Sequence, residues 1–137
     1  MIIWLASYPK SGNTWVRSFL NSLLFNKNNE ADLSEISKID QYPKRSHFIN
    51  LVNEIDNLEK LSSNWIESQK ILNKDNKIKF LKTHHALCKY QNSFFTNGEV
   101  SLGTVHITRD PRNVISSILY HFSKKNYSEA KEFLFDE

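Results

Sequence analysis

The chain has 137 residues, of which 39% are hydrophobic and 24% charged, and its formal net charge is +3. This length suits one globular domain over residues 1–137, because two hydrophobic cores need a longer chain. Since 18 basic residues face 15 acidic ones, the charge does not indicate nucleic-acid binding but suits an anionic small molecule. The single cysteine, Cys88, can form no internal disulfide, so we expect a cytoplasmic location.

A buried strand is expected over residues 2–6, where every side chain is apolar. This run lacks a preceding basic region and is too short for a signal peptide or a membrane span, and we expect no span in the chain. A helix is expected over residues 14–25, because apolar side chains recur there at helical spacing. They are Trp15, Val16, Phe19, Leu20, Leu23 and Leu24.

Residues 32–74 have a helical pattern, in which Asp32 and Glu35 are spaced as an N-terminal capping pair. Pro43 is expected to separate two helices. Two amphipathic segments follow it, over residues 48–58 and 65–72. The stretch between residues 26 and 77 carries no chemical motif and is a candidate for acceptor-specific surface.

Two further strands are expected, over residues 78–83 and 103–108. Asp110 and Pro111 then form a strong helix start, and that helix is predicted to run to about Ser123. A last helix is expected from Asn126 to the chain end, with Glu129 in the capping-box position.

Three strands separated by helices predict an α/β fold with a parallel sheet flanked by helices. Ligands of such sheets bind beyond the carboxyl ends of the strands. Polar clusters follow all three expected strands, at residues 7–15, 82–85 and 108–117. We therefore expect these three clusters to meet in one binding site.

The loop over residues 8–15 has the chemistry of a phosphate site, because a helix start offers backbone N–H groups and partial positive charge. Gly12 allows close backbone approach and Lys10 adds a cation. Ser11, Asn13 and Thr14 add polar donors. The loop is not a Walker A motif, since Lys10 precedes the glycine. A plain structural turn with a solvated Lys10 remains the alternative from these residues alone.

The segment Tyr8-Pro9-Lys10-Ser11-Gly12-Asn13-Thr14-Trp15 resembles the 5′-phosphosulfate loop of sulfotransferases, whose cytosolic members carry Y-P-K-S-G-T-T-W. Asn13 is the one departure from that pattern. The resemblance implies a P-loop-like α/β fold and 3′-phosphoadenosine 5′-phosphosulfate (PAPS) as co-substrate. It also implies transfer of a sulfonate group to the hydroxyl or amine of a small-molecule acceptor. The donor's 5′ end would lie among Lys10, Ser11, Gly12, Asn13, Thr14 and Trp15.

The segment over residues 104–117 is similar to the strand, turn and helix that bind the 3′-phosphate in this family. The resemblance assigns the phosphate to Arg109 and Ser117, which have the family's spacing of eight residues. The forked donors of arginine suit a phosphate. The alternatives are an ion pair of Arg109 with Asp110 or a nearby carboxylate, and a bond from Ser117 to a preceding carbonyl.

The segment Phe80-Leu81-Lys82-Thr83-His84 is similar to the family's K-T-H segment. The resemblance implies that His84 is the catalytic base, and that Lys82 positions the sulfonate or leaving group. Histidine suits this role because its pKa lies near neutrality. The alternative for His84 or His85 is a partly buried ring with a backbone partner. We expect no metal, because these two adjacent residues point apart on an extended strand end.

The family's later R-K-G-x-x-G-D-W-K segment has no match here, which predicts an incomplete sulfotransferase domain. Two functions follow as expectations: a PAPS-dependent sulfotransferase in which Lys10, Lys82 and His84 act in catalysis, or an inactive module that binds PAPS or adenosine 3′,5′-bisphosphate. A kinase is disfavoured because no magnesium-binding motif is recognised. A homo-oligomer is expected to cover apolar surface left by an incomplete domain.

Overall fold

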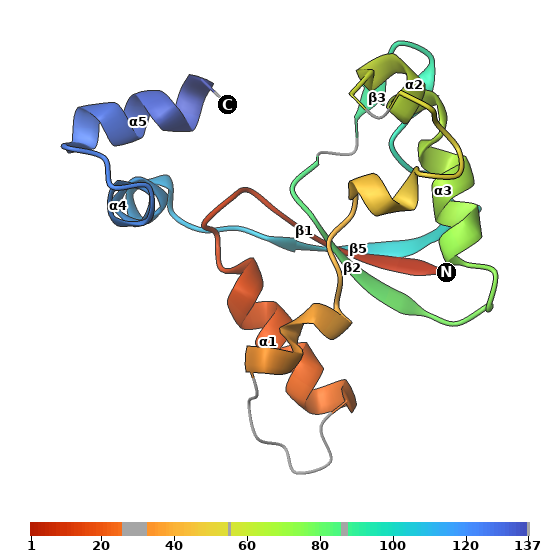
Figure 1. Cartoon of the computed structure of the whole chain (residues 1–137). Coiled ribbons are helices and arrows are strands. Elements are labelled where there is room, and N and C mark those ends of the chain that lie inside the picture. The colour runs from red at the N-terminus through yellow and green to blue at the C-terminus, as the bar shows by residue number, and fades with distance from the viewer. Residues whose placement is uncertain (26–32, 55, 86–87, 137) are drawn as a thin grey trace.

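A computed structural model describes residues 1–25, 33–54, 56–85 and 88–136 of the chain (Figure 1). Its central sheet has three parallel strands in the order β2-β1-β5. Their bounds are β1 (Ile2–Ser7), β2 (Lys79–Thr83) and β5 (Ser101–Ile107). The three predicted strands and the α/β class with a parallel sheet are therefore confirmed.

The helices after β1 and β5 begin where the sequence predicts. Their bounds are α1 (Asn13–Phe25), α4 (Pro111–His121) and α5 (Tyr127–Asp136). The Asp110 carboxylate accepts a hydrogen bond from the Arg112 N–H (2.9 Å), which caps α4, and the helix ends slightly before Ser123. Asn126 caps α5 by accepting from the Glu129 N–H (2.9 Å), and the Glu129 carboxylate accepts from the Lys125 N–H (3.1 Å).

The connection from α1 to β2 is less helical than predicted. It contains two 3₁₀ helices and two short α-helices: η1 (Leu33–Lys38), η2 (Arg45–His47), α2 (Leu58–Ser63) and α3 (Trp65–Leu72). Pro43 lies between η1 and η2 and α3 is confirmed, but the helix predicted over residues 48–58 is wrong. Phe48 and Val52 are buried by a single turn, closed by a bond from the Val52 N–H to the Phe48 carbonyl (2.9 Å). A single turn already places both side chains in the core. The chain therefore does not form the longer helix that their spacing also allows.

Two predicted details, the cap at Asp32 and the apolar side chain of Ile55, lie outside the described residues. A short antiparallel pair was not predicted, because its strands β3 (Lys89–Tyr90) and β4 (Ser93–Phe94) are too short to show a periodic pattern. Among the described residues, no helix combines the length and the apolar composition that a membrane span requires.

The main core lies on the face of the sheet toward α2 and α3, above the sheet in Figure 1. Trp4 is at its centre, with ring centroids 5.5 Å from Tyr42 and 5.4 Å from Phe95, and its indole Nε1 donates to the Ser101 hydroxyl (2.7 Å). A second cluster joins α4 to α5 through Val114, Ile118 and Ala130. The α4–α5 pair therefore has an apolar contact of its own, separate from the main core.

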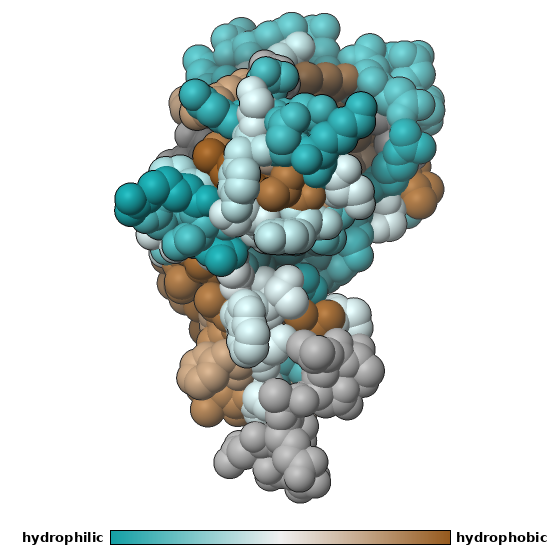
Figure 2. All heavy atoms as spheres, turned by 90° about the vertical axis from the view of Figure 1, so that its left-hand side faces the viewer, coloured by the Kyte–Doolittle hydropathy of each residue, from teal (hydrophilic) through white to brown (hydrophobic). Residues whose placement is uncertain are grey.

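Helix α1 is confirmed, but it buries a polar face and exposes its apolar one. Asn13, Ser18 and Asn21 are buried, while Trp15 is 83% exposed and Phe19 66% exposed. Figure 2 shows hydrophobic side chains at the surface of the lower part of the molecule, where α1 lies. Arg17 attaches α1 to η1 by donating to the Ile36 carbonyl (2.8 Å) and the Ile39 carbonyl (2.6 Å). Polar contacts thus replace the apolar packing that the helical pattern indicates.

The contrast between Trp4 and Trp15 gives a stability prediction. We expect Trp4→Ala to lower the free energy of unfolding by about 3–5 kcal/mol, because it empties the centre of the core. Trp15→Ala is the matched control, and we expect a change within about 0.5 kcal/mol because its ring is exposed. Urea unfolding followed by far-ultraviolet circular dichroism measures both. Equal losses for the two variants would contradict this packing.

Candidate functional site

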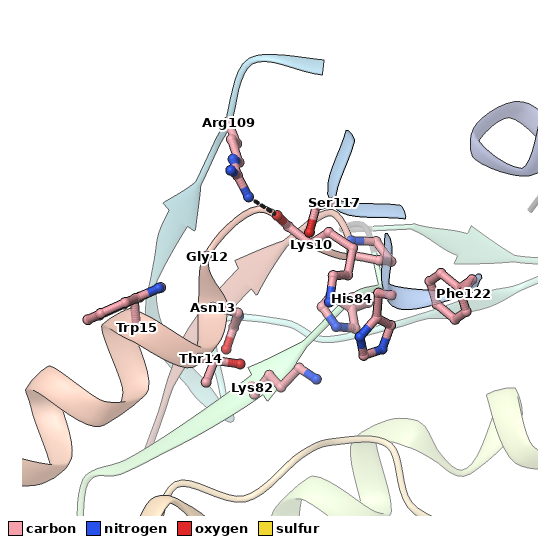
Figure 3. Close-up of a pocket in the computed structure, with 12 residues that line it drawn as sticks. Lys10, Gly12, Asn13, Thr14, Trp15, Lys82, His84, Arg109, Ser117 and Phe122 are labelled. Carbon is pink, nitrogen blue, oxygen red and sulfur yellow. Dashed lines mark hydrogen bonds between the residues drawn. The ribbon is translucent and has the colours of Figure 1, made fainter. Parts of the chain in front are cut away.

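A cavity of about 540 Å³ lies beyond the carboxyl ends of β1, β2 and β5 (Figure 3). The three polar clusters meet there, as the parallel topology predicts. Every predicted site residue except Ser11 contributes to its wall: Lys10, Gly12, Asn13, Thr14, Trp15, Lys82, His84, Arg109 and Ser117. Pro9, His121 and Phe122 complete the lining. Trp15 is so exposed that it forms part of the rim, and in Figure 3 it extends away from His84.

The loop between β1 and α1 is a tight turn that needs left-handed backbone at two positions. Gly12 has φ +103° and Lys10 has φ +64°. Glycine adopts the left-handed region without strain, whereas a lysine rarely does. The Ser11 N–H donates to the Tyr8 carbonyl (3.2 Å), and the Ser11 side chain is buried beneath the loop. The left-handed glycine that a purely structural turn would have is therefore present. The same turn also lines the cavity, as a phosphate site would.

The Asn13 side chain bonds to the end of β1. Its Nδ2 donates to the Leu5 carbonyl (2.9 Å) and to the Ser7 hydroxyl (3.1 Å). The side chain is buried, and its Oδ1 has no hydrogen-bond partner among the described residues. The Asn13 amide hydrogens, which were expected to donate to an anion, therefore donate to β1.

Arg109 lies against the loop, since its Nη1 donates to the Lys10 carbonyl (3.1 Å), which is the dashed line in Figure 3. Asp110 pairs with Arg112 instead, at 2.6 Å between the nearest nitrogen and oxygen. Within the described ranges Arg109 forms no ion pair with Asp110 or with another carboxylate, so that alternative is wrong. The reason is geometric: the Asp110 carboxylate turns toward the first turn of α4, where it accepts from Arg112.

The hydroxyl of Ser117 also remains available to the cavity. Its neighbour Ser116 donates to the Arg112 carbonyl (3.2 Å), and no hydrogen bond of the Ser117 hydroxyl occurs within the described part of the chain. An adjoining cavity of about 480 Å³ shares Lys10, Arg109, Ser117 and His121 with the first one. These four shared residues therefore border both cavities.

His84 leaves β2 with its ring turned toward the end of β1. The ring Nδ1 lies 2.7 Å from the Ser7 carbonyl and 3.3 Å from the Ser7 hydroxyl. A carbonyl oxygen can only accept, so Nδ1 carries the hydrogen and Nε2 keeps its lone pair. The backbone partner of the alternative interpretation is therefore present, yet the same ring lines the cavity.

The surroundings of His84 keep it neutral near pH 7. Partial burial lowers the pKa of His84 below its ordinary value of 6.5, and the charge of Lys82 lowers it further, while the bond to Ser7 opposes both effects. Burial, and then the charge of Arg17, lower the pKa of the Lys82 ammonium, whose Nζ donates to Gln41 Oε1 (3.2 Å). A neutral base thus stands beside a cation that favours its neutral form.

His85 does not join His84 in a shared site. Its ring stacks on Phe95 with centroids 5.3 Å apart, on the core side of the sheet. Among the described residues, no three histidine, cysteine, aspartate or glutamate side chains group in a way that could hold a metal ion.

Two residues outside the sequence motifs, His121 and Phe122, also line the cavity. Phe122 packs against Phe133 of α5, with centroids 4.7 Å apart, so α5 supports this wall. The Tyr8 hydroxyl also donates to the Leu134 carbonyl (2.8 Å), which joins α5 to the loop. His121 follows Ser117 by four residues on one helix, and that spacing is a signal that could have identified it.

The neighbours of His84 give a prediction for its titration. Burial lowers the pKa of His84 most and the charge of Lys82 adds to it, so we expect Lys82→Met to raise that pKa part of the way toward 6.5. The matched control is Lys79→Met, at the far end of the same strand, which should leave the His84 titration unchanged. Ring C–H chemical shifts followed from about pH 5 to 8 measure this, and His84→Gln assigns the signal. A wild-type pKa above 6.5 would contradict the described surroundings.

A family model described as a sulfotransferase domain matches residues 2–137. Searches of curated proteins and of solved structures find no match. The family match includes all three segments that carry the resemblance, from the loop after β1 to the start of α4. The chain therefore belongs to the sulfotransferase domain family.

Proposed function

We propose that the chain transfers a sulfonate group from PAPS to a hydroxyl or amine of a small-molecule acceptor. The observation that carries this proposal is the shared cavity, in which Lys10, His84 and Arg109 come from three different strand ends. Membership of the sulfotransferase domain family supports sulfonate transfer in general. The nature of the donor and acceptor is our proposal.

The cations around the cavity support an anionic donor with phosphate at both ends. Lys10 and the start of α1 suit the 5′-phosphosulfate, because a helix N-terminus and an ammonium both favour negative charge. Arg109 and Ser117 suit the 3′-phosphate, since guanidinium and hydroxyl groups donate to phosphate oxygens. Both residues also border the adjoining cavity, so a ligand that extends between the two spaces would contact them.

The transfer itself is an in-line displacement at sulfur. The acceptor oxygen or nitrogen forms a bond to sulfur, while the bond from sulfur to the phosphate oxygen breaks and adenosine 3′,5′-bisphosphate leaves. His84 takes the acceptor's proton on Nε2, the nitrogen left without a hydrogen. Lys10 stabilises the negative charge that grows on the leaving oxygen, and Lys82 positions the sulfonate.

The catalytic roles predict losses of turnover in folded proteins. We expect His84→Gln to lower the transfer rate by ~10²–10⁴-fold, as loss of a general base does. Lys10→Ala should abolish measurable transfer because the leaving charge is no longer neutralised. Transfer of radiolabelled sulfonate from PAPS to a panel of phenols, alcohols and amines measures both, with circular dichroism as the folding control. A folded His84→Gln protein with the full rate would show that His84 is not the base.

The donor-binding role of Arg109 is tested by affinity. We expect Arg109→Ala to weaken binding of adenosine 3′,5′-bisphosphate by roughly 10–100-fold, because a charge-assisted bond contributes about 1.5–3 kcal/mol. Arg112→Ala is the matched control and should bind as the wild type does, since its side chain is 87% exposed and pairs with Asp110. Isothermal titration calorimetry measures both. Equal effects would indicate only a general attraction between charges.

The transfer and binding experiments also distinguish an active sulfotransferase from the inactive nucleotide-binding module, which is the second function expected from the sequence. Wild-type protein that binds adenosine 3′,5′-bisphosphate but transfers no sulfonate to any acceptor would be a nucleotide-binding module.

A cytoplasmic location and self-association remain predictions of the sequence. Light scattering coupled to size-exclusion chromatography tests the self-association.

A further inference from the structure

A chain of hydrogen bonds joins the first residue of α1 to the ring of His84 through the end of β1. Asn13 bonds to Leu5 and Ser7, and Ser7 in turn contacts His84. We infer that Asn13 is a positioning residue, which holds the end of β1 so that His84 keeps its hydrogen on Nδ1 and presents Nε2 to the cavity. This inference rests on the proposed function for the use of His84 as a base.

The orientation of the Asn13 amide follows from its partners. The Leu5 carbonyl can only accept, so the atom 2.9 Å from it must be the amide nitrogen. That nitrogen carries two hydrogens, and the second is directed at the Ser7 hydroxyl 3.1 Å away. The first bond reaches the backbone carbonyl of Leu5 and the second reaches the side chain of Ser7, and both residues lie in the second half of β1. One side chain thus fixes two positions at the end of the strand.

The cost of this arrangement indicates that it is specific. Asn13 is only 5% exposed, and its Oδ1 finds no hydrogen-bond partner within the described ranges. A buried polar atom without a partner lowers stability, so packing alone would favour an apolar or smaller side chain here. The two bonds to β1 are the evident compensation.

The departure from the family loop has a physical explanation in the same contacts. The similar loop of the cytosolic sulfotransferases has threonine at the position of Asn13. A threonine hydroxyl has one hydrogen and can donate to only one acceptor, whereas the Asn13 amide donates to two. Asparagine therefore ties the phosphate loop to both Leu5 and Ser7.

The end of β1 determines the tautomer of His84 because the Ser7 carbonyl accepts from Nδ1 at 2.7 Å. The opposite tautomer would bring the Nδ1 lone pair against the carbonyl oxygen, which is repulsive. It would also place the hydrogen on Nε2, where a base must be unprotonated. A displacement of Ser7 would weaken this preference for the tautomer protonated on Nδ1. The hydrogen bonds of Asn13 therefore act on His84 indirectly, through the position of Ser7.

The tautomer can be observed without any transfer activity. We propose long-range ¹H–¹⁵N correlation spectra of the full chain with ¹⁵N-labelled histidine, recorded where His84 is neutral. We expect wild-type protein to show His84 protonated on Nδ1, and Asn13→Ala to show a mixture of both tautomers. Asn21→Ala is the matched control, because it removes another buried asparagine of α1, for which no bond to β1 occurs among the described residues, and it should keep the wild-type pattern.

Kinetics supply the second readout. We expect kcat of Asn13→Ala to fall by about tenfold or more, since a misaligned base loses part of the ~10²–10⁴-fold that base catalysis contributes. Asn13→Thr, which can restore one of the two bonds, should lie between Asn13→Ala and the wild type in both kcat and tautomer mixture.

Two results would overturn the inference: a wild-type His84 protonated on Nε2, or a folded Asn13→Ala protein with the wild-type tautomer. If Asn13→Ala fails to fold, Asn13→Thr takes its place, because it can restore only one of the two bonds and should still show more of the Nε2 tautomer than the wild type. A full transfer rate in His84→Gln would instead refute the proposed base and leave the tautomer result standing. The two failures are therefore distinguishable.

Discussion

The parallel pairing of β1 with a strand on each of its sides brings the site together. β1 pairs with β2 from Ile2 to Ala6 and with β5 from Ile2 to Ser7, so all three strands end at the same edge of the sheet. The residues that follow these ends are far apart in the chain, as Lys10, His84 and Arg109 illustrate. Without the central strand their side chains would have no common cavity.

Charge and proton chemistry are coupled within this cavity. Lys82 adds positive charge where an anionic donor is proposed to bind, and the same charge lowers the pKa of His84. Burial is the largest cause of the lowered pKa of His84 and the charge of Lys82 adds to it, so Lys82 contributes both to attraction of the donor and to neutrality of the base. The Ser7 carbonyl opposes the fall in pKa but determines which ring nitrogen is free. The backbone carbonyl of Ser7 thus orients the His84 ring, while the Lys82 side chain supplies positive charge.

Much of the fold could be predicted because the decisive signals are local. The apolar run before Ser7 indicates a buried strand, and Asp110 with Pro111 begins α4 where it was predicted. The residues that line the cavity could be predicted from short motifs at the strand ends, because the carboxyl ends of parallel strands lie at one edge of the sheet. Of the predicted site residues, Ser11 alone lies outside the lining, because the turn directs its side chain inward.

The parts that could not be predicted depend on tertiary contacts. The spacing of Phe48 and Val52 is compatible with a helix, but the core needs only one turn from them. The apolar face of α1 is evident from its period, yet Arg17 attaches the opposite face to η1. The sequence likewise identifies Asn13 as a departure from the family loop without revealing that its amide bonds to β1.

The proposed function requires that one ligand with two phosphate ends binds in this cavity, with its 3′-phosphate at Arg109. The most direct test compares calorimetric affinities for adenosine 3′,5′-bisphosphate and adenosine 5′-monophosphate in wild-type protein and in Arg109→Ala. We predict that the wild type prefers the bisphosphate by at least about tenfold and that the variant loses this preference. Equal affinities of the wild type for the two nucleotides, or a preference that survives the loss of Arg109, would contradict the account.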